Sequence, residues 1–406
     1  MNSYLKRTEV APVKILFLLR SLDCGGAQRQ LTLLAKGLRE RGHDVVVAIF
    51  YSGGPFEKEL CEARVRVRPV NKHGRWDLLG FLVRLIQILR EERPDVIHGY
   101  LVEPNLMTVI LKPLFPTTKV VWGIRGSNTN FRNYDWLRRL DFKLHSWLSR
   151  FPDAIITNSQ AGRKHQLSVK YPAEKVFVIP NGIETERFRP DPKARQRIRL
   201  EWGVAEHEKV IGLVGRLDPQ KDHPVFLEAA ASLVNKRKDT RFVCAGGGPY
   251  EYQTRLQTLA KNLGLGERLL WLGIREDMPA VYNALDIAVS SSSYGEGLSN
   301  AIGEAMACGV PCVVTDIGDS AWMVGDTGEV VPAKDPVALR NAIERLLDQK
   351  SHTPAQIRLR IVEQLSVERL VVSTERVLLT LTCGSRSEKG TGRTADGSKV
   401  APADRG

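Results

Sequence analysis

Short apolar runs alternate with amphipathic stretches along most of the chain. In the first half, runs typical of buried β-strands occupy residues 13–19, 45–50, 96–98, 120–124 and 154–157, with helical patterns between them. The second half repeats this alternation with runs at residues 209–214, 241–245, 269–272, 287–290 and 311–315. Strands that alternate with helices form parallel sheets covered by helices on both faces. The pattern therefore predicts an α/β fold with two Rossmann-like units and a cleft between them.

The division of the chain follows from its proline-rich and weakly apolar stretches. Prolines cluster at residues 180–192, which we expect to connect the two units. We therefore expect an N-terminal domain over residues 1–185 and a C-terminal domain over residues 186–366. A last helical pattern covers residues 367–382. Residues 383–406 have almost nothing to bury, which predicts a disordered tail.

The most informative polar pattern is a pair of glutamates, Glu296 and Glu304, on either side of an expected helix start. Eight helical residues rise about 12 Å, close to the reach from a ribose across a diphosphate to an attached sugar. Carboxylates accept hydrogen bonds from neighbouring hydroxyls, and free N–H groups at a helix start favour phosphate. We expect the helix start to bind substrate through Gly297, Leu298 and Ser299, with Ser299 as the N-cap.

Two cations follow the predicted strand at residues 209–214. Arg216 and Lys221 lie in the loop after this strand, where parallel sheets bind ligands. A leaving nucleoside diphosphate carries about two or three negative charges, which two fixed cations stabilise as the glycosidic bond breaks. The chain has no D-x-D segment at a strand end. We therefore expect neither a metal site nor a cofactor.

These segments together resemble the retaining glycosyltransferases of family four, also called glycosyl transferases group 1, which have the GT-B fold. The resemblance spans roughly residues 13–382. It rests on the Gly25-Gly26 loop and on residues 178–188, 215–223, 245–257 and 294–316. It implies two Rossmann-like domains that face a cleft, with a C-terminal helix returning to the first domain.

Carried over residue by residue, the resemblance implies roles for the polar groups named above. Arg216 and Lys221 would bind the diphosphate, Glu304 the ribose, and Glu296 the transferred sugar. The nucleotide base would contact the loop that holds Ile274 and Arg275, although these side chains do not indicate which base is bound. UDP is expected only because it is frequent in the family. Such enzymes transfer a sugar to a hydroxyl, here of a surface polysaccharide or lipid-linked glycan precursor, and retain its anomeric configuration.

One position departs from the family. Many members carry a histidine beyond the fourth predicted strand of the first domain, where this chain has Arg125. An arginine there could act in catalysis by stabilising the donor's phosphate or orienting an acceptor, but it stays protonated and is a poor general base. No protein base is required if the leaving phosphate oxygen takes the acceptor's proton. His98 and Glu103 remain alternatives near the sugar, and His98 is also consistent with a satisfied histidine at a strand end. Gly25 and Gly26 either approach substrate with their backbone or form a simple turn.

Rival functions remain open from the sequence. A nucleotide-sugar epimerase of similar shape would use the same phosphate contacts without an acceptor. A non-catalytic nucleotide-sugar-binding protein would keep the site and lose turnover, an alternative that Arg125 keeps open. An NAD-dependent dehydrogenase is disfavoured, because no G-x-G-x-x-G follows a strand with an acid about twenty residues further on.

Composition fits a cytoplasmic two-domain enzyme. The chain has 406 residues, of which 43% are hydrophobic, enough for two cores. Its best candidate for a membrane span, residues 78–89, is interrupted by Arg84 and Gln87, and the first twelve residues lack the apolar segment of a secretory signal. The six cysteines form no C-x-x-C pair, so neither zinc nor a disulfide framework is expected.

The charge is concentrated in the first half of the chain. Residues 1–180 hold 29 lysines and arginines against 16 acids, which accounts for the whole net charge of +13. We therefore expect an anionic partner, either a lipid diphosphate acceptor or an anionic membrane surface on the inner face. The amphipathic stretch at residues 131–150 is the expected contact, unless it packs on its own core. Nucleic acid is not expected, because no recognised binding motif is present.

Overall fold

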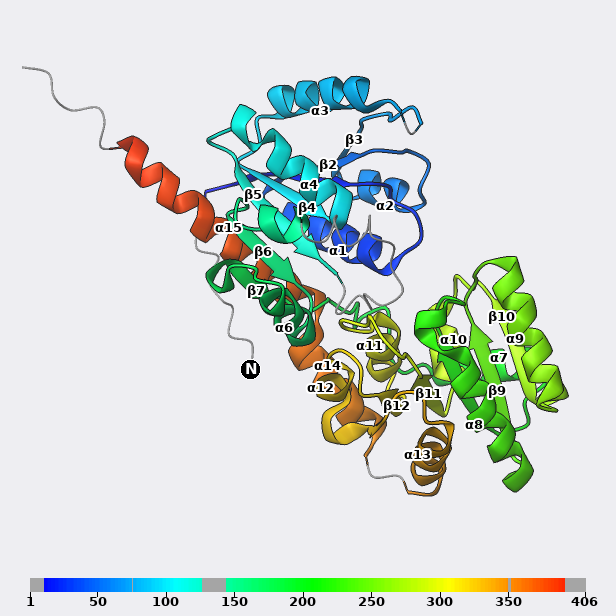
Figure 1. Ribbon diagram of the computed structural model, residues 1–406. Helices are drawn as coiled ribbons and strands as arrows, with labels where there is room; N and C mark the ends of the chain where they lie inside the picture. Colours follow the sequence, from blue (N-terminus) through cyan, green and yellow to red (C-terminus); the bar gives the residue numbers. More distant parts are fainter. Residues whose placement is uncertain (1–10, 75, 126–143, 350–351, 391–406) are drawn as a thin grey trace, which may run out of the picture.

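Two parallel sheets organise the chain (Figure 1). The computed structural model describes residues 11–74, 76–125, 144–349 and 352–390. The N-terminal sheet has seven strands in the order β3-β2-β1-β4-β5-β6-β7. Their bounds are β1 Lys14–Leu19, β2 Asp44–Ile49, β3 Arg66–Pro69, β4 Val96–Tyr100, β5 Lys119–Ile124, β6 Ala154–Thr157 and β7 Val176–Val178.

The second sheet has six strands in the order β10-β9-β8-β11-β12-β13. They are β8 Lys209–Val214, β9 Thr240–Ala245, β10 Leu269–Gly273, β11 Ile287–Ser290, β12 Cys312–Thr315 and β13 Glu329–Val331. In each sheet the strand order reverses beside the first strand, between β1 and β4 and between β8 and β11. Ligands of open parallel sheets bind beyond the carboxyl ends of the strands at such reversals. The candidate loops after β1, β8 and β11 lie at these positions.

Helices cover both faces of each sheet, as the alternating pattern predicts. Around the first sheet lie α1 Gly26–Glu40, α2 Phe56–Glu62, α3 Leu78–Glu92, α4 Val102–Leu111 and α6 Gln160–Ser168. Around the second lie α7 Pro192–Glu201, α8 His223–Lys236, α9 Tyr250–Asn262, α10 Met278–Ala284, α11 Asn300–Ala307, α12 Ser320–Val324 and α13 Pro336–Asp348. No helix in the described ranges is long and apolar enough to cross a bilayer.

The prediction of two parallel α/β units is confirmed, and each predicted strand is found within two residues of its expected ends. Three strands were missed: β3, β7 and β13. All three are edge strands of three or four residues with partly exposed side chains. Strands this short give no apolar run long enough to recognise in the sequence, and β3 is also rich in arginine.

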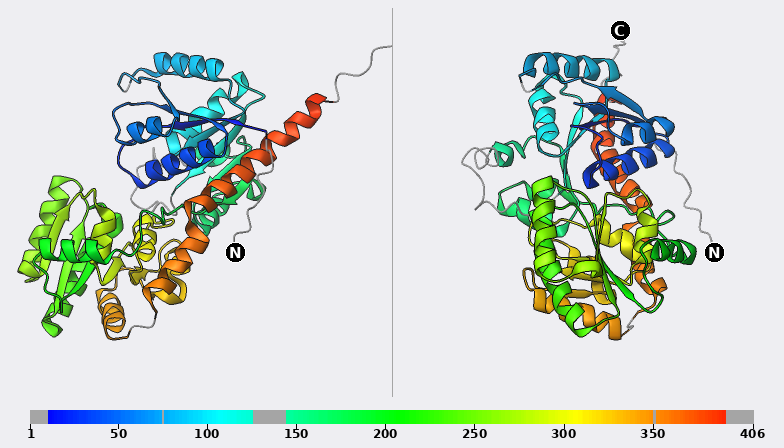
Figure 2. Two further views of the ribbon diagram at one scale, coloured as in Figure 1. Left: turned by 180° about the vertical axis from the view of Figure 1, so that it is seen from behind. Right: turned by 90° about the vertical axis from the view of Figure 1, so that its right-hand side faces the viewer.

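The chain returns to the first sheet through its last two helices, α14 Pro354–Leu365 and α15 Val367–Gly390 (Figure 2). Leu370, Val371 and Leu378 of α15 pack in the same core as α1. A Cβ on Gly37 of α1 would lie 2.3 Å from a methyl of Val371, so the glycine permits close packing of the two helices. The expected returning helix is therefore present.

The returning helix is longer than its sequence pattern predicts. It continues to Gly390, whereas we expected it to end at residue 382 and a disordered tail to follow. Residues 383–390 contain no proline, and one glycine inside a helix costs only about 1 kcal/mol relative to alanine. Residues 391–406 lie outside the described part of the chain.

Most of the expected membrane contact at residues 131–150 also lies outside the described ranges. Within the described remainder, Leu148 packs against the core beneath β5, whereas Leu144 and Trp147 are about half exposed. The predicted apolar stripe is therefore divided between core and surface at this end.

Candidate active site

The loops that follow β8 and β11 are joined by one buried ion pair. Lys221 donates to both carboxylate oxygens of Glu296, with its Nζ at 3.0 and 2.8 Å. Glu296 also accepts hydrogen bonds from the Gln220 amide at 3.2 Å and from the Ser292 hydroxyl at 3.1 Å. The side chain of Lys221 is 17% exposed and that of Glu296 9%. The structure thus brings two of the predicted site residues into direct contact.

Arg216, by contrast, reaches into solvent. Its side chain is 73% exposed, and its ion pair with Asp218 is long, at 4.0 Å. The guanidinium therefore remains accessible to an incoming anion. It lies five residues before Lys221 in the same loop, so one exposed cation and one paired cation follow β8.

Glycines after β9 support this cationic loop. A Cβ on Gly246 would lie 2.0 Å from the carbonyl oxygen of Gly215, and one on Gly248 would lie 2.3 Å from that of Leu217. Gly246 also has a φ of +139°, which side chains rarely adopt. These glycines let the loop after β9 pack directly against the backbone of Gly215 and Leu217, on either side of Arg216.

Helix α11 starts where the sequence pattern predicts, directly after the N-cap Ser299, but the predicted geometry of the two glutamates is different. It begins at Asn300, so Glu296 precedes the helix instead of lying on one face of it with Glu304. The separation of about 12 Å along a helix face is therefore wrong as an account of the pair. Gly295 has a φ of +71° and turns the chain before the helix, which directs Glu296 toward Lys221.

Glu304 lies on α11 and contacts a different helix. The Tyr282 hydroxyl of α10 donates to its carboxylate at 2.9 Å. Burial raises the pKa of Glu304 to about 7, although this hydrogen bond lowers it. The two glutamates therefore have different partners. Glu296 accepts from Lys221, and Glu304 accepts from Tyr282 and has a pKa of about 7.

The first turn of α11 carries no side-chain cap. Ser299 occupies the N-cap position as predicted, but its side chain makes no capping hydrogen bond. The preceding residue, Leu298, is almost fully buried and fixes the start of the helix in the core. Uncapped N–H groups at a helix start favour an anion.

The start of α1 faces the start of α11. Gly26 is the first residue of α1, and a Cβ there would lie 3.2 Å from the side-chain nitrogen Nδ2 of Asn300. Gly25 occupies the N-cap position of α1, also without a side-chain cap. The Gly25-Gly26 loop thus brings the N-terminal ends of two helices, one from each sheet, close together.

Arg125 is connected to the same helix start through a chain of hydrogen bonds. Its guanidinium donates to the Tyr100 hydroxyl and, at 3.2 Å, to the Asn181 side-chain oxygen. The Asn181 amide donates in turn to the side-chain oxygen of Asn300 at 2.8 Å. Arg125 also lies over the Tyr100 ring, with the guanidinium carbon 4.6 Å from the ring centroid. It therefore links the end of β5 to α11.

His98 is buried within the first sheet. Its ring lies 5.2 Å from that of Phe17 and 4.9 Å from that of Tyr100. Burial, and next the positive charge of Arg125, hold its pKa well below the ordinary 6.5. Neither ring nitrogen has a hydrogen-bond partner within the described residues, so His98 is not the satisfied histidine of the alternative interpretation. The other alternative, Glu103, is exposed and pairs with Arg20 at 3.5 Å.

The two residues expected near the base differ in their surroundings. Arg275 donates at 2.8 Å to Asp277 and to Glu201 of α7, so its guanidinium is occupied by carboxylates. Ile274 is 79% exposed and lies beside Gly247, where a Cβ would be 2.8 Å from the isoleucine side chain. Of the two, Ile274 is the group that can pack against a base.

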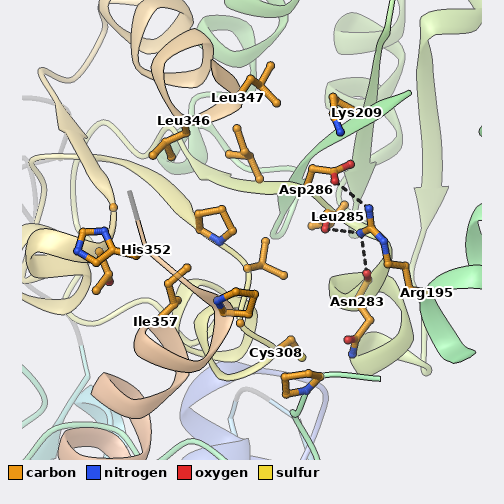
Figure 3. A pocket seen from close by; sticks show the side chains of 18 of the residues that line it. Arg195, Lys209, Asn283, Leu285, Asp286, Cys308, Leu346, Leu347, His352 and Ile357 are labelled. Atoms are coloured by element: carbon orange, nitrogen blue, oxygen red, sulfur yellow. Dashed lines mark hydrogen bonds and ion pairs between the residues drawn. The ribbon is translucent and has the colours of Figure 1, made fainter. Parts of the chain in front are cut away.

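A cavity of about 400 Å³ lies elsewhere in the second unit (Figure 3). Its walls come from α13, α14 and the amino ends of β8, β11 and β12. Arg195 at its edge is bound to Asp286 at 2.8 Å and to the carbonyl oxygens of Asn283 and Leu285. The predicted site residues lie at the opposite, carboxyl ends of these strands. This cavity is therefore separate from the candidate active site.

Several connecting residues were missed by the sequence analysis. Besides Asn181, Asp319 accepts hydrogen bonds from the first two N–H groups of α6, at 2.6 and 2.8 Å. Its own N–H donates to the Gly297 carbonyl oxygen at 2.9 Å. A Cβ on Gly297 would lie 2.6 Å from the side-chain oxygen of Asn158. These contacts join the two sheets around the loop of Glu296.

Comparisons with known proteins match both halves of the chain. The family model described as Glycosyltransferase Family 4 matches residues 24–187, and that described as Glycosyl transferases group 1 matches residues 208–349. The chain belongs to this family, glycosyltransferase family four, and is a glycosyltransferase. The resemblance inferred from the sequence is confirmed.

Among curated relatives is an Escherichia coli protein named UDP-Gal:alpha-D-GlcNAc-diphosphoundecaprenol alpha-1,3-galactosyltransferase. It is 29% identical over 285 residues, 66% of this chain and 70% of that protein. A GDP-mannose-dependent alpha-(1-6)-phosphatidylinositol monomannoside mannosyltransferase of Mycolicibacterium smegmatis is 34% identical over 205 residues, 48% of this chain. The match spans only 53% of that second relative.

Solved structures show the same fold. HepE of Anabaena, in complex with UDP and glucose, superimposes with a TM-score of 0.80 at 23% identity, covering 90% of this chain and 99% of that one. WaaG, described as a glycosyltransferase involved in lipopolysaccharide biosynthesis, gives a TM-score of 0.66 at 18% identity, over 93% of this chain and all of that one. The fold is therefore GT-B.

The pKa of Glu304 leads to a testable pH dependence. Only the ionised carboxyl accepts two hydrogen bonds from neighbouring hydroxyls, and this form is lost as the pH falls through about 7. We expect the donor KM to rise as the pH is lowered from about 8 to about 6. Glu304→Gln should raise the donor KM at every pH and remove its dependence within this window. An unchanged pH profile in the variant would show that Glu304 does not bind the donor.

Proposed function

We propose that the protein is a retaining glycosyltransferase that moves a sugar from a UDP-sugar to a hydroxyl of a lipid-linked or surface glycan precursor. The observation that carries this proposal is the contact between Lys221 and Glu296, which joins the loops after β8 and β11 beside the exposed Arg216. The complexes of HepE with UDP and the name of the Escherichia coli relative support the choice of donor and acceptor. We further propose domains at residues 1–185 and 186–366.

Each end of the donor has a partner in this proposal. Arg216 and Lys221 bind the diphosphate, together with the uncapped start of α11. Glu304 accepts hydrogen bonds from the ribose, and Ile274 packs against the base. Glu296 accepts hydrogen bonds from the sugar hydroxyls. The start of α1 at Gly25 and Gly26 approaches the sugar and the acceptor from the other sheet.

The ion pair of Glu296 implies an exchange of partners. A bound diphosphate competes with Glu296 for Lys221, because both are anions and the ammonium group is shared. Glu296 then keeps its hydrogen bonds from Gln220 and Ser292 and offers its remaining lone pairs to the sugar. Negative charge grows on the diphosphate as the glycosidic bond breaks, so Lys221 binds more tightly in the transition state than before it.

The acceptor's proton passes to the leaving phosphate oxygen in this mechanism. The acceptor oxygen bonds to the anomeric carbon on the face from which the diphosphate departs, and the departing oxygen takes the proton. Arg125 supplies no base, because its guanidinium stays protonated. Through Asn181 it positions Asn300 at the start of α11, where the phosphates would bind.

The experiment that tests this function follows the products of one reaction. The protein is incubated with UDP-hexoses and with lipid extract that supplies acceptors, and both UDP release and labelled product are measured. An early proton NMR spectrum of the product should show the anomeric configuration of the donor. Inversion would exclude the retaining mechanism. Release of an altered UDP-sugar without an acceptor would indicate an epimerase, and binding of donor without turnover would indicate a non-catalytic protein.

We also expect turnover without a divalent metal. Arg216 and Lys221 supply two positive charges to the diphosphate, the role that a divalent cation fills in metal-dependent transfer. Treatment with EDTA should leave the initial rate unchanged, measured as UDP release after removal of the chelator-metal complex. Loss of activity that manganese or magnesium restores would contradict a metal-free mechanism.

A further inference from the structure

The exposed side of α3 is apolar in its N-terminal half, whereas its C-terminal half exposes Gln87, Arg90 and Glu91. Trp76, just before the helix, is 86% exposed, and Leu78, Leu79 and Val83 are 57%, 80% and 64% exposed. We call these four residues the α3 apolar face. The other side of the helix is already buried, since Phe81, Leu85, Ile88 and Leu89 pack in the core of the first sheet.

Such an arrangement is unusual for a helix on a protein surface. A surface helix normally places polar residues opposite its buried stripe, and adjoining exposed apolar side chains mark an interaction site. Figures 1 and 2 place α3 at the edge of the first unit, on the side far from the second sheet. The α3 apolar face is therefore available to a partner outside the molecule.

Two cations on either side of a tyrosine lie beside this face at the carboxyl edge of the sheet. Lys72, Tyr51 and Arg20 follow the neighbouring strands β3, β2 and β1 in turn. The Lys72 ammonium lies 5.9 Å and the Arg20 guanidinium carbon 5.7 Å from the centre of the Tyr51 ring. We call these three residues the basic row. It leads from the loop before α3 toward Gly25, which follows β1 in the same edge.

The acids nearest this surface are paired with cations. Asp77 is bound to Arg84, and Glu103 pairs with Arg20 at 3.5 Å. Lys72, by contrast, donates to the Gly74 carbonyl oxygen and pairs with no acid among the described residues. The first 180 residues also carry all of the net positive charge. A tryptophan and leucines flanked by cations are the composition of a surface that enters the headgroup region of a bilayer.

We propose that the α3 apolar face docks on a bilayer that contains anionic phospholipids, with the basic row against the headgroups. The alternative occupant, a second copy of the chain, is disfavoured by charge. A two-fold contact would place the same patch on both partners and bring two basic rows together. Anionic headgroups instead complement Lys72 and Arg20.

Docking in this way would serve the proposed transfer. The basic row connects the apolar face with the Gly25-Gly26 loop, so the acceptor side of the active site would lie close to the bilayer surface. A lipid-linked acceptor could then present its hydroxyl without leaving the bilayer. This consequence rests on the proposed function, but the docking itself does not.

The first test is flotation of the full-length protein with vesicles, without donor or acceptor. The protein should float with vesicles of phosphatidylcholine and phosphatidylglycerol and detach at 1 M salt, where the screening length is about 3 Å. The triple variant Trp76→Ser/Leu79→Gln/Val83→Gln should partition at least about tenfold less, since each buried leucine or valine contributes roughly this factor. Flotation of the triple variant equal to that of the wild type would overturn the proposal.

A matched control uses exposed apolar residues of the second unit. Leu200 on α7 is 81% exposed and Val337 on α13 is 56% exposed, similar to Leu79 and Val83. The variant Leu200→Gln/Val337→Gln should float like the wild type. An equal loss in this control would show that general surface hydrophobicity, and not α3, causes binding. Lys72→Gln/Arg20→Gln should lose the preference for phosphatidylglycerol, and an unchanged preference would contradict the role of the basic row.

A second measurement locates the contact. Lipids brominated near the headgroup should quench the tryptophan fluorescence of the wild type, and Trp76→Phe should float normally but lose most of this quenching. Equal quenching in Trp76→Phe would place the bilayer contact elsewhere. A lipid-free dimer that the triple variant converts to a monomer would assign the face to a second copy and overturn the proposal. Because no assay uses UDP-sugar, the result is independent of whether transfer occurs.

Discussion

Replacement of Lys221 by alanine is expected to lower kcat/KM by about 10²–10³-fold, the usual cost of removing one group that stabilises transition-state charge. Its Nζ lies within 3.0 Å of both Glu296 oxygens, at the joined ends of β8 and β11. The diphosphate gains negative charge during bond cleavage, so the loss should fall mainly on kcat. Arg216→Ala should have an effect of similar size, because its exposed guanidinium is the other cation of the loop.

The control for both variants is Lys209→Ala. Lys209 is the first residue of β8, at the opposite end of the strand from Arg216 and Lys221, and it has the same charge. It should retain wild-type kinetics in the same coupled assay for UDP release. If Arg216→Ala and Lys221→Ala both keep near wild-type turnover, the loop after β8 does not bind the leaving diphosphate.

Glu296→Gln is expected to change binding and turnover in opposite directions. The substitution removes the anion that occupies Lys221 in the ligand-free protein, so UDP should bind about tenfold more tightly, as expected for loss of one nearby like charge. Turnover should fall by about 10²-fold, because a neutral amide accepts the sugar hydroxyls less strongly as charge develops. Calorimetry with UDP and initial rates with the UDP-sugar measure the two effects separately.

A control for this variant removes an acid that lies away from the site. Glu363 on α14 is exposed, so Glu363→Gln should leave both UDP affinity and turnover unchanged. Weaker UDP binding by Glu296→Gln would contradict the proposed competition for Lys221. It would indicate that Glu296 holds Lys221 in place for the diphosphate.

The sequence predicted the parts of the structure that depend on neighbouring residues along the chain. Apolar runs identified the buried strands, because a strand covered on both faces must be apolar nearly throughout. The position of Arg216 and Lys221 after β8 followed from the same pattern. The edge strands β3, β7 and β13 escaped detection because each has only three or four residues, and β3 also alternates arginine with valine and proline.

The start of α11 followed from local signals, but the relation between Glu296 and Glu304 did not. Gly297 and Ser299 are good signals for a helix start, but Glu296 turns toward Lys221 because a distant loop supplies an ammonium group there. That partner cannot be seen from the local sequence. Because the helix begins only at Asn300, Glu296 lies before it, and the two glutamates do not share one helix face.

Contacts between the two sheets could not be predicted from the pattern at all. Asn181 and Asp319 look like ordinary loop residues in the sequence, yet one joins Arg125 to Asn300 and the other caps α6. Asn181 lies 56 residues from Arg125 and 119 from Asn300, and Asp319 lies 159 residues from Gln160. Only the relative position of the sheets brings them together, and hydrophobic periodicity carries no information about it.

Titration calorimetry of UDP against the wild type, Arg216→Ala, Lys221→Ala and Lys209→Ala tests the central claim most directly. The claim is that the loop after β8 binds the diphosphate of the donor. We expect UDP to bind the wild type and Lys209→Ala equally, and to bind each of the other variants at least about tenfold more weakly, as for loss of one charged hydrogen bond. Equal affinity of all four proteins for UDP would contradict the account.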